Sequence, residues 1–135
     1  MIKVNGISYG WGDVDVKIPG LDLVVQEISY GDEQEMEESY GKGNYKASGK
    51  LSMHRDDYDD ILDYCRAKGL SFYGVELPSV VVSYGNSGGR TRIDELKRVT
   101  FVKRSHKAAQ GDKTLSVDID LMIVGGIVED GVQPV

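Results

Sequence analysis

The sequence predicts a mainly β fold, a β-sandwich or barrel with one α-helix packed against the sheet, and three observations lead to this prediction. Several short runs alternate apolar and polar side chains, which is the period of a half-buried strand. Apolar side chains recur at helical spacing in one stretch, at about residues 55–68. The chain holds 17 glycines and 3 prolines among 135 residues, a composition that indicates many turns. At this length we expect one domain spanning residues 1–135.

The N-terminal part of the chain predicts a hairpin followed by two further strands. Two short apolar runs flank Asn5 and Gly6, and an Asn-Gly pair between strand-like residues favours a tight hairpin turn. Residues 14–18 alternate apolar and polar side chains, and Leu21 to Tyr30 form the next apolar stretch. We therefore expect the first strands of the sheet here.

An acidic, glycine-rich segment at residues 31–44 follows these strands. Two interpretations remain open from the residues alone. A run of carboxylates forms a solvated, mobile loop by default. A long segment without structure of its own also fits a hairpin arm that becomes ordered against a partner. The candidate contact residues of this segment are its carboxylates and one tyrosine: Asp32, Glu33, Glu35, Glu37, Glu38 and Tyr40.

The stretch that ends at Gly69 begins as a strand and continues as the predicted helix. Aspartates crowd the first turns of the helix, and Arg66 and Lys68 close its last turn, as the helix dipole favours. Gly69 occupies the position where a left-handed C-terminal residue is expected, and Ser52 or His54 could be the N-cap. Four side chains at i, i+3, i+4 and i+7 form the face predicted to anchor the helix to the sheet: Tyr58, Ile61, Leu62 and Cys65.

Beyond the helix, the sequence again predicts strands. Residues 70–77 predict a short strand that stops before Pro78, and a run of valines at 80–82 predicts another. Residues 96–104 are strand-like as well.

The clearest strand of the chain is predicted at residues 114–124. Its long apolar row, from Leu115 to Ile123, is expected to face the core. Gly125 and Gly126 break the alternation, so residues 125–135 are predicted to form a loose C-terminal arm. The polar row of the strand is then expected to face away from the core: Ser116, Asp118 and Asp120.

Charge and chemistry exclude several classes of function. The formal net charge of −6 argues against a protein that binds the phosphates of nucleic acid. Cys65 is the one cysteine, so no intramolecular disulfide is possible, and a buried core thiol is its expected role. The sequence shows no apolar run of membrane-spanning length and no signal-peptide core, so we expect synthesis in a reducing cytoplasm.

The search for catalytic or metal-binding residues predicts a protein that is not an enzyme. His54 and His106 have no neighbour at metal-ligand spacing. The carboxylates sit in the helix and the acidic segment, where solvation is their ordinary role. We therefore expect no catalytic residue, no metal and no cofactor.

The order of segments resembles the tail tube proteins of tailed bacteriophages. These are related in fold to the haemolysin-coregulated tube proteins of type VI secretion and other contractile injection systems. The resemblance covers nearly the whole chain and is carried by these stretches in this order: GISYGWGDVDVKIPG, EISYGDEQEMEESYGKGNYKASGKLSM, HRDDYDDILDYCRAKG, SVVVSY and ELKRVTFVKRSHKAAQGDKTLSVDIDLMIVGGI.

The resemblance implies a structural virion protein that assembles into stacked hexameric rings. The sheets of neighbouring subunits would join into one continuous channel, with the helix outside it and the segment at 31–44 reaching an adjacent ring. The partners implied are further copies of the chain and other tail proteins, such as sheath, terminator, baseplate or tape measure. DNA would pass through without specific binding, and the protein would not insert into a membrane. Ser116, Asp118 and Asp120 would line the channel, where acidic side chains discourage adhesion of DNA. The protein would be made and assembled in the host cytoplasm and reside in the virion tail.

Three alternatives remain open at the level of sequence. The same fold would suit a tail terminator, tip or adaptor protein, and it would suit the tube of an injection system that translocates proteins. A third alternative is a small β-sandwich that binds carbohydrate, with Trp11 and tyrosines stacking on sugars. Self-association separates the tube from the carbohydrate-binding module.

Overall fold

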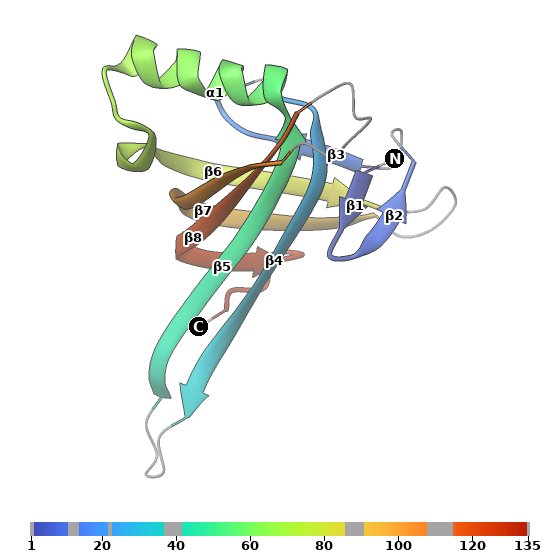
Figure 1. The fold of residues 1–135 in the computed structure, drawn as a ribbon. Helices are drawn as coiled ribbons and strands as arrows, with labels where there is room; N and C mark the ends of the chain where they lie inside the picture. The colour runs from blue at the N-terminus through green and yellow to red at the C-terminus, as the bar shows by residue number, and fades with distance from the viewer. Residues whose placement is uncertain are drawn as a thin grey trace.

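Eight strands form one curled sheet in the computed structural model, which describes residues 2–10, 14–21, 23–36, 42–85, 91–107 and 115–134 (Figure 1). The strand order across the sheet is β2-β1-β4-β5-β8-β7-β6-β3. All pairs of neighbouring strands are antiparallel except β1 and β4, which are parallel. The strands are β1 (Ile2–Val4), β2 (Ile7–Tyr9), β3 (Val14–Lys17), β4 (Val25–Met36), β5 (Lys42–His54), β6 (Glu76–Tyr84), β7 (Arg92–Lys107) and β8 (Ser116–Glu129).

Local signals account for the first hairpin. Asn5 and Gly6 connect β1 to β2, and both adopt positive φ angles, 50° and 85°. A two-residue turn of this kind matches the twist of the flanking strands, and Asn and Gly tolerate its backbone best. The predicted hairpin turn is confirmed.

A buried polar cluster joins strands that are not neighbours in the sheet. Tyr30 of β4 and Tyr84 of β6 both donate hydrogen bonds to the Oδ2 atom of Asp94 in β7, the second at 3.1 Å. Asp94 is 5% exposed. The ring of Tyr9 in β2 meets the ring of Tyr84 edge-on, with 5.6 Å between centroids. These contacts bring β4 and β2 against β6 and β7 across the interior, so the sheet curls around its core.

The Tyr30 contact predicts a loss of stability at alkaline pH. Burial, and then the hydrogen bond to Asp94, raise the pKa of Tyr30 above its ordinary value of 10. The unfolded chain releases this proton near pH 10 whereas the folded chain retains it, so the stabilisation is complete below pH 10 and is lost as pH rises above it. We expect the melting temperature to fall more steeply between pH 9 and 11 in the natural protein than in Tyr30→Phe. Parallel slopes for the two proteins would contradict this assignment.

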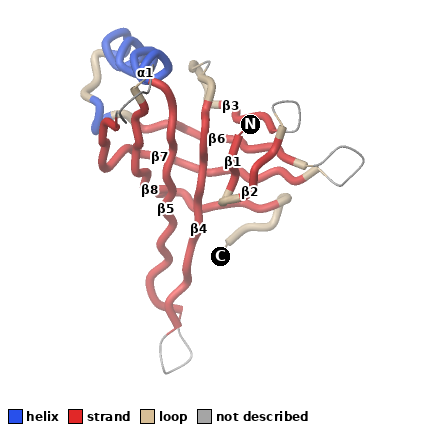
Figure 2. The backbone as a smooth tube through the Cα atoms, turned by 45° about the vertical axis from the view of Figure 1, so that its right-hand side comes forward, coloured by secondary structure: helices blue, strands red, loops and turns tan. Residues whose placement is uncertain are grey.

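The helix α1 (Arg55–Lys68) covers one end of the curled sheet (Figure 2). His54 is its N-cap residue, without a side-chain capping bond, and Gly69 ends it in the left-handed conformation with φ of 68°. The helix buries Tyr58, Ile61 and Cys65, and Leu62 packs half-buried against the same core. This helix is too short and too polar to cross a bilayer, and no other helix in the described part of the chain is a candidate.

An arginine from the sheet holds the covering helix. Arg104 of β7 donates a hydrogen bond of 2.7 Å to the hydroxyl of Tyr58 and lies over the ring of Phe72, 4.6 Å from its centroid. Phe72 in turn stacks on Phe101 of β7, with 4.8 Å between ring centroids. The end of the sheet is therefore closed by aromatic packing.

The prediction of a loose C-terminal arm at residues 125–135 is wrong for its first five residues. Strand β8 continues through Gly125 and Gly126 to Glu129 and remains paired with β7. A Cβ atom on Gly125 would lie 2.7 Å from the Cβ of Lys97, so the absent side chain permits a close approach of strands instead of ending one. Ile127 is consequently buried.

The predicted strand at residues 70–77 is also wrong. Residues 72–74 form a 3₁₀ helix, and β6 begins at Glu76 and runs through Pro78. The register passes from Leu77 opposite Val99 to Ser79 opposite Lys97, which leaves Pro78 beside a bulge at Arg98. Arg98 has a φ of 54° there. Proline has no N–H group, so it fits where the ladder of hydrogen bonds is interrupted.

Candidate assembly surfaces

The polar row of β8 lies on the side of the sheet turned away from the core. We call this side of β1, β4, β5, β8 and β7 the outer face. Val117 and Ile119 are fully buried on the core side, so Ser116, Asp118 and Asp120 lie on the outer face. Leu115 does not belong to the core row as predicted, because it precedes β8 and is 46% exposed.

Asp118 is held by β5 rather than presented to solvent. It is 7% exposed, and the hydroxyl of Ser52 donates a hydrogen bond of 2.6 Å to its Oδ1 atom. The Nζ atom of Lys50 lies 3.8 Å from its other oxygen. Ser116 and Asp120 are half-buried. Sequence reasoning missed Ser52 and Lys50, because their proximity depends on the register between β5 and β8.

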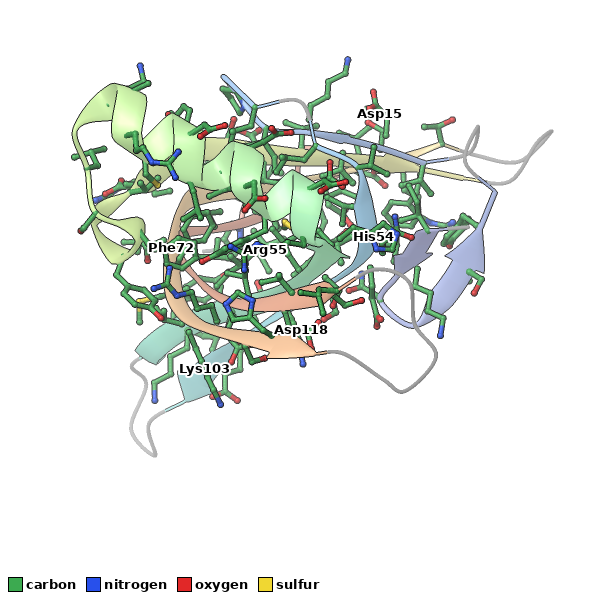
Figure 3. All side chains as sticks on the ribbon, turned by 45° about the horizontal axis from the view of Figure 1, so that its top comes forward. Asp15, His54, Arg55, Phe72, Lys103 and Asp118 are labelled. Carbon is green, nitrogen blue, oxygen red and sulfur yellow. The ribbon has the colours of Figure 1, made fainter. Side chains whose placement is uncertain are left out.

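Charges of opposite sign alternate from strand to strand across the centre of the outer face. Glu33 of β4 stands opposite Lys46 of β5, and Asp120 of β8 stands between Lys50 of β5 and Lys103 of β7. Lys103 and Asp118 lie on the side of the sheet away from α1 (Figure 3). Cross-strand pairs of opposite charge favour this register. The rows are Lys3 on β1, Glu27 and Glu33 on β4, Lys46 and Lys50 on β5, Asp118 and Asp120 on β8, and Lys103 on β7.

This arrangement changes the electrostatic expectation for the outer face. Asp120 stands between two lysines and Lys50 also lies close to Asp118, so the negative net charge of the chain is not concentrated there. The outer face is charge-balanced in its centre, whereas further along β8 the exposed apolar side chains of Met122 and Val124 lie on the same face.

Residues 31–36 and 42–47 form an antiparallel ribbon that projects from the body of the sheet (Figure 1). We define the arm as Gly31–Met36 of β4 together with Lys42–Ala47 of β5. β5 pairs with β8 only from Ser48 to His54, so the arm is paired within itself and lacks a second neighbour among the described strands. Glu37, Glu38 and Tyr40 lie outside the described residues, as does the side chain of Glu35.

Tyr45 connects the base of the arm to β8. Its hydroxyl donates a hydrogen bond of 2.6 Å to Asp32 and accepts one of 3.2 Å from the backbone N–H of Ile127. Burial, and then the bond to Asp32, raise the pKa of Tyr45. This side chain bridges the point where β5 and β8 separate. Of the acidic residues predicted for contact with a partner, Asp32 is thus occupied within the chain, whereas Glu33 is exposed.

A groove lies beside the arm, between β5 and the β7–β8 pair. Its volume is about 890 Å³, and residues 31–33 and 45–48 of the arm and its base line one side. Three exposed apolar side chains, Val102, Met122 and Val124, line the other side. Apolar side chains grouped in a groove are a feature of surfaces that contact another molecule.

The described residues show no metal-binding arrangement. No group of histidine, cysteine and acidic side chains among them could hold a metal ion. The ring of His106 packs edge-on against Tyr58, with 5.4 Å between centroids. Cys65 is buried, and burial raises the pKa of its thiol, which disfavours the reactive thiolate.

Comparison with known proteins identifies the fold. No protein-family model matches the chain, and no curated protein sequence matches it.

Several solved structures do match the chain. The structure of a type six secretion system protein aligns with a TM-score of 0.57 and 14% identity, covering 81% of this chain and 77% of that one. A chain in the cryo-EM structure of the anti-feeding prophage (AFP) baseplate aligns with a TM-score of 0.55 and 13% identity, covering 88% and 91%. The crystal structure of an Hcp protein aligns with a TM-score of 0.49 and 16% identity, covering 82% and 71%. The chain therefore shares its fold with a type six secretion system protein and with a chain of the AFP baseplate.

Proposed function

We propose that this protein is a structural subunit that assembles with copies of itself into the tube of a tail-like injection apparatus. The observation that carries the proposal is the fold shared with a type six secretion system protein and with a component of the AFP baseplate over four fifths or more of the chain. No enzymatic activity forms part of this role.

The strand edges of the isolated chain support self-assembly. The sheet has two end strands, β2 and β3, and the arm adds further strand edges without a neighbour among the described residues. Unpaired edges invite pairing with another chain and are a liability in a monomer. In a closed ring each such edge meets a neighbouring subunit, which removes the liability.

The proposal extends to stacked hexameric rings whose channel wall is the outer face. Ser116, Asp118 and Asp120 would then repeat around the channel, DNA would pass without specific binding, and the arm would contact the next ring. The charge-balanced centre of the outer face supports a wall to which a passing molecule does not adhere. Sheath, terminator, baseplate or tape-measure proteins would be the other partners, and the tail of a virion the place of assembly.

A second candidate is a baseplate or adaptor ring rather than the tube itself. The match to the AFP baseplate favours it, because that alignment covers 91% of the baseplate chain. An adaptor would form one closed ring without continued stacking.

Negative-stain electron microscopy of the purified protein over a range of concentrations tests both candidates. We expect tubes with a central hole at high concentration, because each ring offers the next a copy of the same surfaces. Discrete rings that never stack would favour the adaptor. A protein that stays monomeric in light scattering at every concentration would contradict both.

A further inference from the structure

The two edges of the arm carry opposite charges. The sequence of β4 from Gly31 to Met36 contains three acidic residues and no basic one, whereas β5 from Lys42 to Ala47 contains two lysines and no acidic residue. Within the arm these strands already face each other, with Glu33 directly opposite Lys46. Each strand of the arm also has an edge that faces away from its partner within the arm. We call these the far edges, and each has the same charged residues beside it as the paired edge.

Both far edges are open to another strand. β1 pairs with β4 only at Glu27 and Ile28, and the side chain of Asn5 then accepts a hydrogen bond from the backbone of Tyr30. From Gly31 onward, no described strand pairs with β4 on that side. On the other side, the backbone pairing of β5 with β8 ends at Ser48, so no described strand pairs with Lys42 to Ala47 on that side, and the Tyr45 hydroxyl maintains a contact with the N–H of Ile127 in β8. A two-stranded ribbon is marginally stable in water by itself, so these edges favour the addition of strands.

The groove beside β5 offers a place for an added strand. Val102, Met122 and Val124 are 51%, 53% and 47% exposed along it, and the open edge of β5 forms its opposite wall. An extended backbone is the ligand that satisfies a row of unpaired N–H and C=O groups, and its side chains cover the neighbouring surface.

We infer that the acidic β4 edge of one arm pairs with the basic β5 edge of the arm of a second copy, along this groove. The inference rests on the proposed self-assembly and specifies which surfaces meet. Pairing of two β5 edges places lysines opposite lysines, and pairing of two β4 edges places carboxylates opposite carboxylates. Like charges directly across two strands destabilise a sheet, so the unlike edges are selected.

This pairing gives the assembly a direction. An acidic edge meeting a basic edge is a head-to-tail contact, which leaves one edge of each kind free for the next copy. Such a contact generates a ring if the rotation closes and a helical filament if it does not. A symmetric dimer formed through the arms is disfavoured by the same charges.

Chemical crosslinking of mixed single-cysteine variants tests the pairing. Glu33→Cys marks the β4 edge and Lys46→Cys marks the β5 edge, and both positions are exposed. A short bismaleimide is added to each variant alone, to an equal mixture of the two, and to the natural protein, whose one cysteine is buried. We expect more crosslinked dimer in the mixture than in either variant alone, and none in the natural protein. Light scattering before crosslinking records whether each sample has assembled, and circular dichroism records whether it is folded.

The outcomes separate the pairing from the assembly itself. Crosslinks in either variant alone at the level of the mixture would show pairing of like edges and overturn the inference. Assembly without crosslinks in the mixture would overturn it while the proposed function stands. Absence of assembly in the natural protein would overturn both.

Charge reversal gives a second test that does not depend on cysteines. Lys42→Glu with Lys46→Glu makes both edges acidic, and Glu33→Lys with Glu35→Lys makes the β4 edge basic. We expect each folded double variant to lose assembly alone, and an equal mixture of the two to regain it, because each then offers the edge that the other requires. Retained assembly in both double variants alone would contradict the selection by charge.

Discussion

Replacing Ile61 by alanine is expected to lower the free energy of unfolding by about 2–5 kcal/mol. The side chain is 1% exposed and belongs to the core on which α1 packs, so its removal leaves a cavity that the rigid sheet fills poorly. Urea denaturation followed by circular dichroism measures the loss.

Leu62→Ala provides the matched control for this prediction. Leu62 is the next residue of the same helix and loses as many carbon atoms, but it is only half-buried. We expect a clearly smaller loss than for Ile61. Equal losses, or none in either variant, would mean that the helix does not present this face to the sheet.

Replacing Gly49 by alanine is expected to destabilise the protein by about 1–3 kcal/mol. The added Cβ atom would lie 2.7 Å from the carbonyl oxygen of Ser29 and 3.3 Å from the Cβ of Tyr30. Backbone of β4 would have to move away from β5 at the base of the arm, where the two strands are paired on both sides of this position. Thermal and urea unfolding measure the change.

Gly31→Ala is the control that separates crowding from the general effect of the substitution. Gly31 lies on the neighbouring strand, and a Cβ atom added to it would meet no other heavy atom within 4 Å. Alanine there reduces the freedom of the unfolded chain, so we expect no loss, or a gain of about 0.4–1 kcal/mol. Destabilisation of similar size at both positions would contradict the close approach at Gly49.

Signals between residues close in sequence predicted their elements well. The Asn5-Gly6 turn and the left-handed Gly69 are properties of single residues, and the structure confirms both. The spacing of Tyr58, Ile61 and Cys65 depends only on the helical period. Such features need no knowledge of the rest of the fold.

Predictions were wrong where a residue's role depends on strands that are distant in sequence. Gly125 and Gly126 have the composition of a strand end, yet here they allow β8 to pass close to Lys97 of β7. Pro78 interrupts a strand pattern, yet the bulge at Arg98 accommodates it. Both depend on a register that composition does not encode.

The candidate surfaces show the same difference between features that follow from one strand and features that depend on the order of strands. The polar row of β8 follows from alternation along one strand. The lysines on either side of that row come from β5 and β7, and the order of strands in the sheet decides that they meet it. An acidic row in the sequence thus becomes one part of a balanced surface in the fold.

The alternating rows of the outer face also determine how far its electric field reaches. Neighbouring strands lie about 4.8 Å apart, which is less than the Debye length of about 8 Å at physiological ionic strength. The electric fields of neighbouring rows therefore cancel at a shorter distance than the distance over which dissolved ions screen a charge. A molecule moving along this face at a distance of one hydration layer meets a potential that changes sign with each strand and averages to little. Its passage is expected to depend weakly on salt, unlike passage along a surface of uniform charge.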